Sequence, residues 1–421
     1  MVPTATPQGR AQTIWVISKY LSPKEYGFET RLFAMARHWR AEGREPVMIG
    51  SDSNHLAQMP ALDCPQVEER IDGLRCVWLR TLRYGRTASM RRVLSWFHFE
   101  WRLLRMRLEG LPAPDVILVS SLSLLTVLNG LRLKRRFGCP MVFEVRDIWP
   151  LTMVEEGGFS AWHPLSLLLG WIERLGYRRA ELVVGTMPNL GPHASRVAGR
   201  EVRCACIPFG FDPDVVARQE ASLREARVIV RSPDELVVGY AGSMGTTNAL
   251  HTIVACAVRL KDDPRFRFVL LGDGDLRARF MAETADCPRV EWVGRVPREQ
   301  VLGILRQCDL LYFAVHDSKV WESGMSLNKL TDYLLSRRPV LASYSGFPSI
   351  LNEAGCGEYL PSNDEEALLA ALHRYAAMPR TEREAMGERG RRWLFDHRPW
   401  PVLARQYLAL LDGLSGSGRA G

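Results

Sequence analysis

The chain has 421 residues, 47% hydrophobic and 24% charged, and a formal net charge of +8. This composition excludes a disordered or fibrous protein, and the length predicts two or three domains. The basic excess fits nucleic acid, an anionic membrane or a phosphorylated substrate. Zinc-finger spacings, RNA-binding aromatic motifs and basic tails are missing from the sequence, so we expect no nucleic-acid partner.

Apolar runs alternate with helical patterns through the first half of the chain. Residues 13–18 predict a strand, 30–42 a helix and 45–50 a second strand. Further strands are predicted at 116–119, 140–145 and 181–185. The apolar stretch at 116–131 is interrupted by serines, an asparagine and a glycine, so it favours a strand followed by a helix over a membrane span.

The pattern starts again after a charged segment that ends near Glu235. Five more strands are predicted, at 236–240, 266–271, 290–293, 309–315 and 339–342. We therefore predict an α/β fold of two Rossmann-like doubly wound domains facing a central cleft, with ligands beyond the carboxyl ends of the strands. The predicted domains are residues 1–212 and 213–399, with a C-terminal helix at about 400–414 packed back on the first.

A polar turn, Gly324 to Lys329, separates the apolar strand at 309–315 from a helical pattern of leucines. A helix N-terminus carries unpaired amides and a partial positive charge, so it favours a phosphate. Lys329 would add a full charge, and Asp332, one turn further, would accept hydrogen bonds from a ribose. The alternative is an ordinary strand-to-helix connection in which Asn328 or Ser326 caps the helix.

Seven separated segments together resemble a GT-B glycosyltransferase of family 4, in the subgroup that includes the fucosamine transferase WbuB. The resemblance covers nearly the whole chain and implies a retaining enzyme that uses a nucleotide sugar. The matching segments are residues 27–33, 144–150, 207–212, 240–245, 269–274, 293–297 and 324–342.

The resemblance assigns most of the expected donor site to the second domain. There the donor diphosphate would lie on the helix start, the ribose on Asp332, and the base near Arg295 and Val296. The other donor-binding residues it implies are Gly242, Ser243, Gly245, Met325, Ser326, Leu327, Asn328 and Lys329. Four features depart from the family pattern: Gly324 and Asp332 replace two glutamates, Thr246-Thr247-Asn248 replaces a basic pair, and Leu327 replaces a proline. The subgroup itself often has glycine at the first of these positions.

On the acceptor side, the resemblance implies a role for Gly27 and for the charged end of the strand at 140–145. Strand alternation places Glu144 and Arg146 on one face and Asp147 on the other. One alternative is a structural Glu144–Arg146 pair. The other is a catalytic role, in which Asp147 or Arg146 faces the acceptor hydroxyl and Asp147 positions or deprotonates it, unless the leaving diphosphate takes the proton.

Neither a metal nor a cofactor is expected, and the co-substrate is predicted to be a nucleotide sugar linked to UDP. Asp273-Gly-Asp275 matches a metal-binding D-x-D pattern, but it directly follows a strand, where Gly274 favours a tight turn. No G-x-G-x-x-G follows the first strand, which argues against a dinucleotide-dependent oxidoreductase. The nine cysteines are odd in number and scattered, so we expect them to be reduced.

Residues 84–108 interleave arginines with aromatic and aliphatic residues. This pattern is typical of a helix that binds an anionic membrane surface, but it also fits a domain helix with solvated arginines. Trp162 and Trp171 would extend the same face. The N-terminus lacks a secretory pattern. We therefore expect a cytoplasmic protein that can adhere to the inner face of the cytoplasmic membrane.

Together these features predict a metal-independent, retaining transfer of a sugar from a UDP-sugar to a lipid-linked saccharide in cell-surface polysaccharide synthesis. The polyprenyl diphosphate carrier comes from the resemblance. The alternatives are a nucleotide-sugar 2-epimerase of the same architecture and a non-catalytic nucleotide-sugar-binding subunit of an envelope assembly complex. The sequence leaves open the sugar, the acceptor, the linkage and the oligomeric state.

Overall fold

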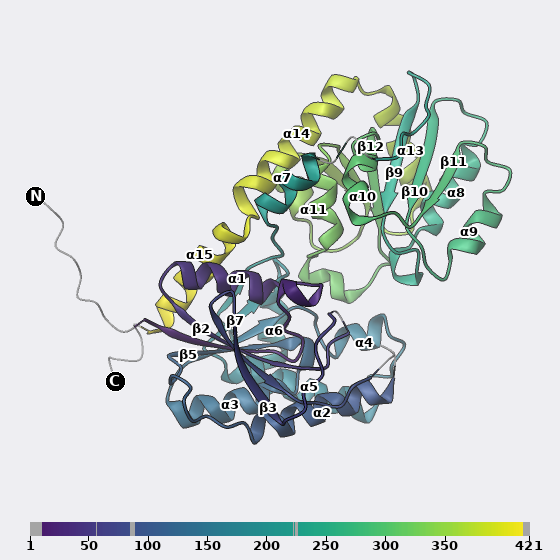
Figure 1. The fold of residues 1–421 in the computed structure, drawn as a ribbon. Helices are drawn as coiled ribbons and strands as arrows, with labels where there is room; N and C mark the ends of the chain where they lie inside the picture. The colour runs from purple at the N-terminus through teal and green to yellow at the C-terminus, as the bar shows by residue number, and fades with distance from the viewer. Residues whose placement is uncertain (1–10, 56, 85–88, 222, 224–225, 416–421) are drawn as a thin grey trace, which may run out of the picture. The chain divides into compact units, whose positions relative to one another are not determined.

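The computed structural model describes residues 11–55, 57–84, 89–221, 223 and 226–415 (Figure 1). The chain divides into two compact units: unit 1 is Met1–Pro208 with Trp400–Gly421, and unit 2 is Phe209–Pro399. Sequence analysis placed the boundary after residue 212. The segment 209–212 packs with unit 2 instead, because Phe211 lies in its core and the Phe211 amide donates to the carbonyl of Arg398 at 3.1 Å.

An eight-stranded sheet forms the centre of unit 1, in the order β3-β4-β2-β1-β5-β6-β7-β8. Neighbouring strands pair in parallel, except that β3 and β4 are antiparallel. Strands β1 and β5 are buried along their whole length because helices cover both faces of the sheet. Sequence analysis did not predict β3, β4 and β8. The strands are β1 Thr13–Ile17, β2 Glu45–Ser51, β3 Gln66–Ile71, β4 Leu74–Leu79, β5 Val116–Ser120, β6 Met141–Val145, β7 Leu182–Gly185 and β8 Cys204–Cys206.

Helices α1 and α15 pack on one face of this sheet, and α2, α3, α5 and α6 pack on the other. Helix α15 returns from the end of the chain to α1, where the indole N–H of Trp39 donates to the carbonyl of Ala404 at 3.2 Å. Among the described residues, no helix is long and apolar enough to cross a membrane. The helices are η1 Lys24–Tyr26, α1 Arg31–Ala41, α2 Met90–Leu104, η2 Ser121–Ser123, α3 Thr126–Phe137, α4 Leu151–Glu155, α5 Pro164–Arg179, α6 Leu190–Ala198 and α15 Trp400–Ser415.

Unit 2 contains a six-stranded parallel sheet in the order β11-β10-β9-β12-β13-β14. Helices α7, α10, α11, α12 and α14 pack on one face, and α8, α9 and α13 on the other. The strands are β9 Leu236–Ala241, β10 Phe266–Leu271, β11 Val290–Gly294, β12 Leu310–Ala314, β13 Val340–Ser343 and β14 Gly357–Leu360. The helices are α7 Pro213–Ala221, η4 Thr246–Asn248, α8 His251–Arg259, α9 Arg277–Glu283, α10 Arg298–Leu305, η5 Lys319–Ser323, α11 Asn328–Leu335, α12 Ile350–Ala354, α13 Glu365–Ala377 and α14 Arg380–His397. The predicted fold class, two doubly wound α/β units, is confirmed.

A buried ion pair joins four elements of unit 1. The carboxylate of Glu144, at the end of β6, lies 3.4 Å from the guanidinium of Arg31, the first residue of α1, and both side chains are buried. The hydroxyls of Ser120 on β5 and Tyr407 on α15 donate to the same carboxylate at 3.4 and 3.5 Å. Arg31 also donates to the carbonyl of Ile207 at 2.9 Å. Glu144 is therefore part of the framework of unit 1, and its ion-pair partner is Arg31.

Replacing Glu144 should destabilise unit 1 strongly, because Arg31 would be left as a buried, uncompensated charge. We expect Glu144→Ala to lower the free energy of unfolding by about 3–5 kcal/mol, measured by urea denaturation. The matched control is Glu68→Ala, which removes the exposed carboxylate that lies 3.3 Å from Arg75 in the same unit. That change should cost less than about 1 kcal/mol. Equal losses in the two variants would contradict the framework role of Glu144.

Candidate active site

In unit 2 the chain runs from β9 through β10 to β11 on one side of the sheet, then crosses to β12 and continues through β13 to β14 on the other side. The direction of the connections therefore reverses between the neighbouring strands β9 and β12, which form the switch point. In such sheets ligands bind beyond the carboxyl ends of the strands at that point. The loop after β9 carries Gly242, Ser243 and Gly245. The segment after β12 leads to α11, which carries Lys329 and Asp332. The fold thus brings the two main parts of the predicted donor site to the same sheet edge.

Two glycine-rich loops contact each other backbone to backbone at this edge. A Cβ on Gly272, whose φ is +128°, would lie 1.8 Å from the carbonyl oxygen of Gly242. A Cβ on Gly274 would lie 2.6 Å from the carbonyl carbon of Met244. The amide of Met244 donates to the carbonyl of Asp273 at 2.9 Å. Only glycine fits these positions, so the loop after β10 supports the loop after β9.

Helix α11 begins without a side-chain cap. Its N-cap residue is Leu327, whose apolar side chain cannot accept a hydrogen bond, and the first turn contains no acidic residue. The alternative in which Ser326 or Asn328 caps this helix is therefore wrong. Instead, the Ser326 hydroxyl accepts a hydrogen bond from the amide of Phe209 at 3.4 Å. The partial positive charge of the helix start remains available to an anion.

The ammonium group of Lys329 lies beside the loop after β9. It donates to the side-chain oxygen of Asn248 at 2.7 Å and lies 5.1 Å from the centre of the Tyr240 ring. A Cβ on Gly242 would lie 3.2 Å from Nζ, which places the ammonium next to that glycine. Burial lowers the pKa of Lys329 to about 8. A partly buried cation whose direct partners are neutral favours an anionic ligand.

Asp332 is paired within the protein. Its two carboxylate oxygens each accept a hydrogen bond from the guanidinium of Arg298 at 2.6 Å. Burial raises the pKa of Asp332, and Arg298 opposes that shift. Sequence analysis missed Arg298, which starts α10 and lies 34 positions before its partner. A ribose that binds to Asp332 must therefore share the carboxylate with this arginine.

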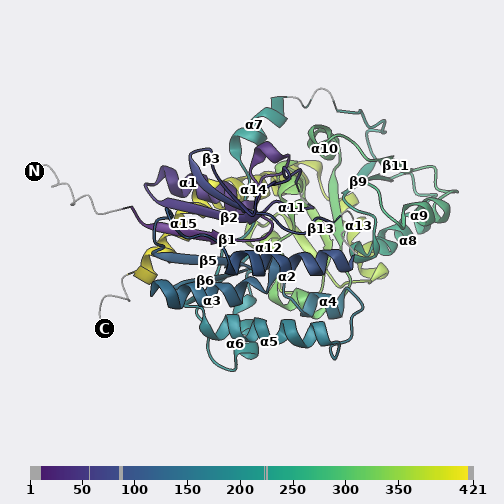
Figure 2. The same cartoon turned by 60° about the horizontal axis from the view of Figure 1, so that its bottom comes forward.

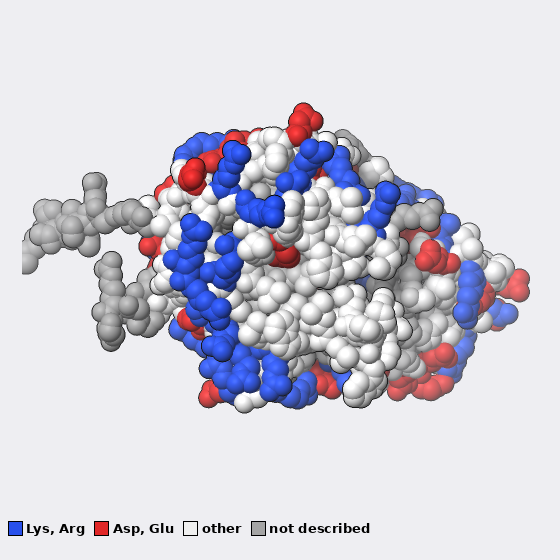
Figure 3. Space-filling view, turned by 90° about the horizontal axis from the view of Figure 1, so that it is seen from below, with Lys and Arg blue, Asp and Glu red and all other residues white. Residues whose placement is uncertain are grey.

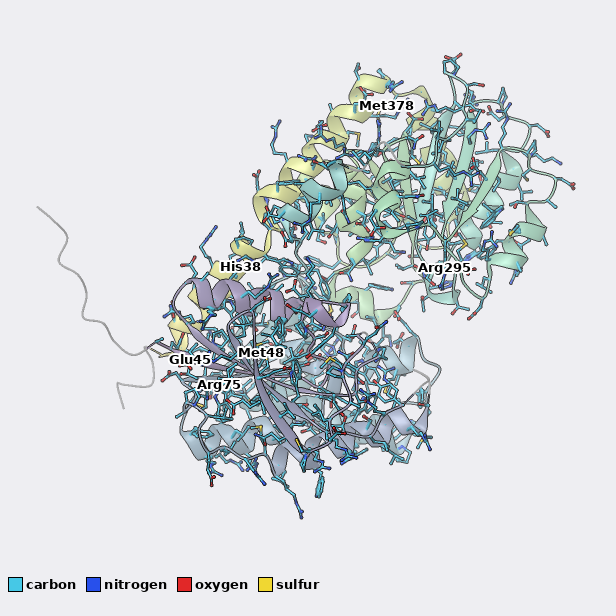
Figure 4. The ribbon with its side chains drawn as sticks, in the orientation of Figure 1. His38, Glu45, Met48, Arg75, Arg295 and Met378 are labelled. Carbon is cyan, nitrogen blue, oxygen red and sulfur yellow. The ribbon has the colours of Figure 1, made fainter. Side chains whose placement is uncertain are left out.

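Arg295 and Val296 follow β11. Val296 packs against the core of unit 2, whereas the side chain of Arg295 is 83% exposed and lies 3.6 Å from Asp273 (Figure 4). Asp273 also accepts a hydrogen bond from the amide of Gly274 at 3.0 Å, which fits the tight turn predicted there. Among the described residues, no group of three or more His, Cys, Asp or Glu side chains is arranged to hold a metal ion.

Histidine 316, which sequence analysis did not single out, lies in the segment after β12. Its Nε2 is 2.7 Å from the carbonyl oxygen of Thr246, and its ring stacks on His251 at 5.4 Å. The residues Thr246-Thr247-Asn248 form the short helix η4. These contacts connect η4 to the segment that follows β12, while Asn248 binds Lys329 from the other end of η4.

The carboxyl edge of the sheet in unit 1 holds a second buried lysine, which sequence analysis also missed. Lys19 follows β1, donates to the carbonyl of Ser53 at 2.7 Å, and lies 4.9 Å from the centre of the Tyr20 ring. Burial lowers its pKa to about 7, although the nearby Asp52 raises it. Arg92 donates to the Tyr20 hydroxyl at 3.3 Å and thereby connects helix α2 to this edge.

The predicted catalytic pair, Arg146 and Asp147, lies just beyond β6 at the same edge. Burial lowers the pKa of Arg146. The positive charges of Arg146 and Arg92 favour the ionised form of the Asp147 carboxyl group. Asp147 is exposed to solvent, in contrast to the buried Glu144. Gly27 ends η1 with φ +89° in an exposed loop before α1.

Two families of known domains match the two halves of the chain. The glycosyl transferase 4-like domain matches residues 27–210, and glycosyl transferases group 1 matches residues 235–377. None of the curated proteins has a significantly matching sequence.

Many solved structures share the fold. The sucrose-phosphate synthase of Thermosynechococcus elongatus is 17% identical with a TM-score of 0.67, and the alignment covers 96% of this chain and 100% of that one. HepE of Anabaena, in complex with UDP, is 14% identical with a TM-score of 0.62 over 96% and 100% of the two chains. The E. coli trehalose-6-phosphate protein bound with UDP-2-fluoro glucose is 12% identical with a TM-score of 0.69 over 95% and 99%.

These likenesses are below 25% identity and establish the fold, while the two family matches identify the type of enzyme. The protein is a GT-B glycosyltransferase, with a glycosyl transferase 4-like domain in residues 27–210 and a domain of the glycosyl transferases group 1 family in residues 235–377.

Proposed function

We propose that the protein transfers a sugar from a UDP-sugar to a hydroxyl group of a lipid-linked saccharide, with retention of the anomeric configuration and without a metal ion. The polyprenyl diphosphate carrier, the role in cell-surface polysaccharide synthesis and the WbuB-like subgroup come from the sequence resemblance. UDP is proposed because structures of similar fold, such as HepE, are complexes with UDP. The observation that carries the donor assignment is the position of Lys329 at the uncapped start of α11.

The chemistry of the donor explains why this position matters. When the glycosidic bond breaks, negative charge builds up on the departing diphosphate, and fixed positive groups nearby stabilise the transition state. The amides of Met325 to Asn328, the helix dipole and Lys329 are the groups that unit 2 offers at one place. Asn248 stands where relatives have part of a basic pair, and it holds the Lys329 ammonium by its side-chain oxygen.

The acceptor is assigned to unit 1. Asp147 is the exposed carboxylate beyond β6, and we propose that it orients the acceptor hydroxyl, while the departing diphosphate takes the proton. Arg146 and Arg92 would offset the negative charge of a diphosphate-linked acceptor near this carboxylate.

Helix α2 supports a position at the inner face of the cytoplasmic membrane. Its Trp96, Phe99 and Leu103 lie in the core, while a second apolar set lies exposed at a spacing of three and four residues. The exposed set is Met90, Leu94, Phe97, Trp101 and Leu104. Residues 85–88 of the predicted basic segment lie outside the described residues.

Removing the Lys329 charge should reduce transfer. With UDP-sugars and polyprenyl-linked saccharides as substrates, we expect Lys329→Ala to lower the rate at least tenfold, equivalent to about 1.4 kcal/mol, and to weaken the thermal stabilisation by UDP. Lys261→Ala, which removes an exposed lysine of unit 2, is the control and should behave as wild type. Unchanged transfer by Lys329→Ala would refute the donor assignment, and sugar interconversion without an acceptor would identify an epimerase instead.

The affinity for UDP should depend on pH through Lys329. Its pKa in the free protein is lowered to about 8, and a bound diphosphate favours the charged form and raises that pKa. Binding therefore takes up protons, and the affinity should fall as the pH rises above about 8. Calorimetric titrations of Lys329→Arg, whose guanidinium stays charged, should lack this fall. The ionisation of UDP itself is common to both proteins, so equal profiles would contradict the prediction.

Asp332 and Lys329 should contribute to different parts of the donor. We expect Asp332→Ala to weaken UDP about tenfold, because a hydrogen bond to a charged group is lost, and to leave pyrophosphate binding unchanged. Lys329→Ala should weaken both ligands. The check is a pair of calorimetric titrations for each variant. A loss of pyrophosphate affinity in Asp332→Ala would show that the carboxylate acts by positioning α10 and α11 through Arg298, and not by holding the ribose.

A further inference from the structure

The C-terminal half of α5 and the loop after α6 form a groove of about 690 Å³ on unit 1. Six residues line it, four of them arginines: Trp171, Arg174, Leu175, Arg178, Arg179 and Arg200. Arg200 comes from the loop after α6, and its guanidinium donates to the carbonyl of Arg178 at 2.6 Å. This bond fixes one wall of the groove to the end of α5.

The positive charge of the groove is not neutralised by the protein. Throughout the described part of the chain, no carboxylate forms an ion pair with any of these four arginines. The carboxylate of the neighbouring Glu181 is already paired with Lys134. Glu173, which is on the same helix, faces the core and binds His193 at 2.9 Å. Four guanidinium groups without a counter-charge constitute a site for an anion such as a phosphate group.

The exposed face of α5 is apolar before it becomes basic. Leu167, Trp171, Arg174 and Arg178 follow one another at helical spacing, so they lie on one stripe. Trp171 is 56% exposed and Leu167 is 52% exposed, although the opposite side of the helix packs in the core. Trp162, in the turn before α5, is 83% exposed. An exposed tryptophan pair beside unpaired arginines is the composition of a surface that lies at a membrane interface.

Helix α5 shares its side of the sheet with α2, because α3 contacts both helices (Figure 2). Each of these two helices buries one apolar stripe in the core and exposes another. Figure 3 looks at this side and shows a wide area without charged atoms, with a band of lysine and arginine next to it. Exposed apolar side chains that gather on one side of a folded protein mark an interaction site.

We propose that the groove binds the phosphate of an anionic phospholipid while Trp162, Leu167 and Trp171 enter the interfacial layer of the bilayer. Helix α5 then adds a second membrane contact on the same side of the unit 1 sheet as α2, and the donor site of unit 2 takes no part in it. We favour a lipid surface over a second protein because an anionic bilayer offers both kinds of partner. Its phosphates can pair with the arginines, and its apolar layer can accommodate the adjacent tryptophans and leucine. The proposal rests on the proposed function in one respect: a lipid-linked acceptor is located in the membrane, so membrane binding would bring the enzyme to its acceptor.

The test is sedimentation of the full chain with vesicles of phosphatidylcholine, alone or mixed with phosphatidylglycerol. We expect wild type to bind the mixed vesicles, less strongly at higher salt. The double variant Arg174→Gln with Arg178→Gln should lose about tenfold in affinity, since each cation at an anionic surface adds to binding. Trp162→Ser with Trp171→Ser should lose binding as well. All four side chains are exposed, so folding should be preserved, and thermal unfolding verifies this.

The matched control is Arg392→Gln with Arg405→Gln, which removes the same charge from exposed positions on α14 and on α15. Its affinity for the vesicles should equal that of wild type. Wild type that fails to sediment with mixed vesicles would overturn the proposal, as would equal losses in the two arginine double variants. UDP-induced stabilisation should be unchanged in every variant, so a failure of the donor assignment and a failure of membrane binding produce different results.

Discussion

The donor site depends on one partly buried positive charge that has no carboxylate partner among the described residues. Lys329 is held by the neutral side chain of Asn248 beside Gly242, and burial lowers its pKa. The arrangement needs the glycine loops to be in backbone contact, because any side chain on Gly272 would displace the loop after β9. In the empty protein no carboxylate of a described residue stabilises the Lys329 ammonium group. A bound diphosphate can therefore provide this stabilisation, and the free energy gained contributes to binding.

The two units use buried charge in opposite ways. In unit 1, Glu144 and Arg31 satisfy each other, and two hydroxyl groups complete the carboxylate's hydrogen bonds. That pair joins helices from both ends of the chain to the sheet and leaves nothing for a ligand. In unit 2, Lys329 has a neutral partner, so its charge remains for an anion. The neighbouring Asp332 is intermediate, because Arg298 already holds it.

The helices of unit 1 add a third arrangement of charge. Helices α2 and α5 bury one apolar stripe and expose another, and the exposed stripe of α5 ends in a groove of unpaired arginines. The hydrophobic effect accounts for the buried stripes, which complete the core. The exposed stripes add nothing to the stability of the isolated domain. Contact with an anionic lipid bilayer, as proposed above, would bury these exposed stripes in an apolar layer and place the arginines beside phosphates.

The sequence by itself determined the two sheets, because apolar runs such as Val116–Ser120 and Leu310–Ala314 are buried on both faces and alternate with helical patterns. It also determined the start of α11, where Gly324 lies between a strand and a helix and Lys329 lies in the first turn of that helix. Strands β3, β8 and β14 escaped prediction because they lie at the sheet edges, where partial exposure weakens the apolar signal. Strand β4 was also missed, although most of its residues are buried. Only the tertiary structure decided the partners of charged groups: Arg31 for Glu144, Arg298 for Asp332, and, within the described part of the chain, no carboxylate for the arginines of α5. These pairings depend on which side chains the fold brings within a few ångströms of each other, and residues far apart in sequence carry no local pattern that records such a distance.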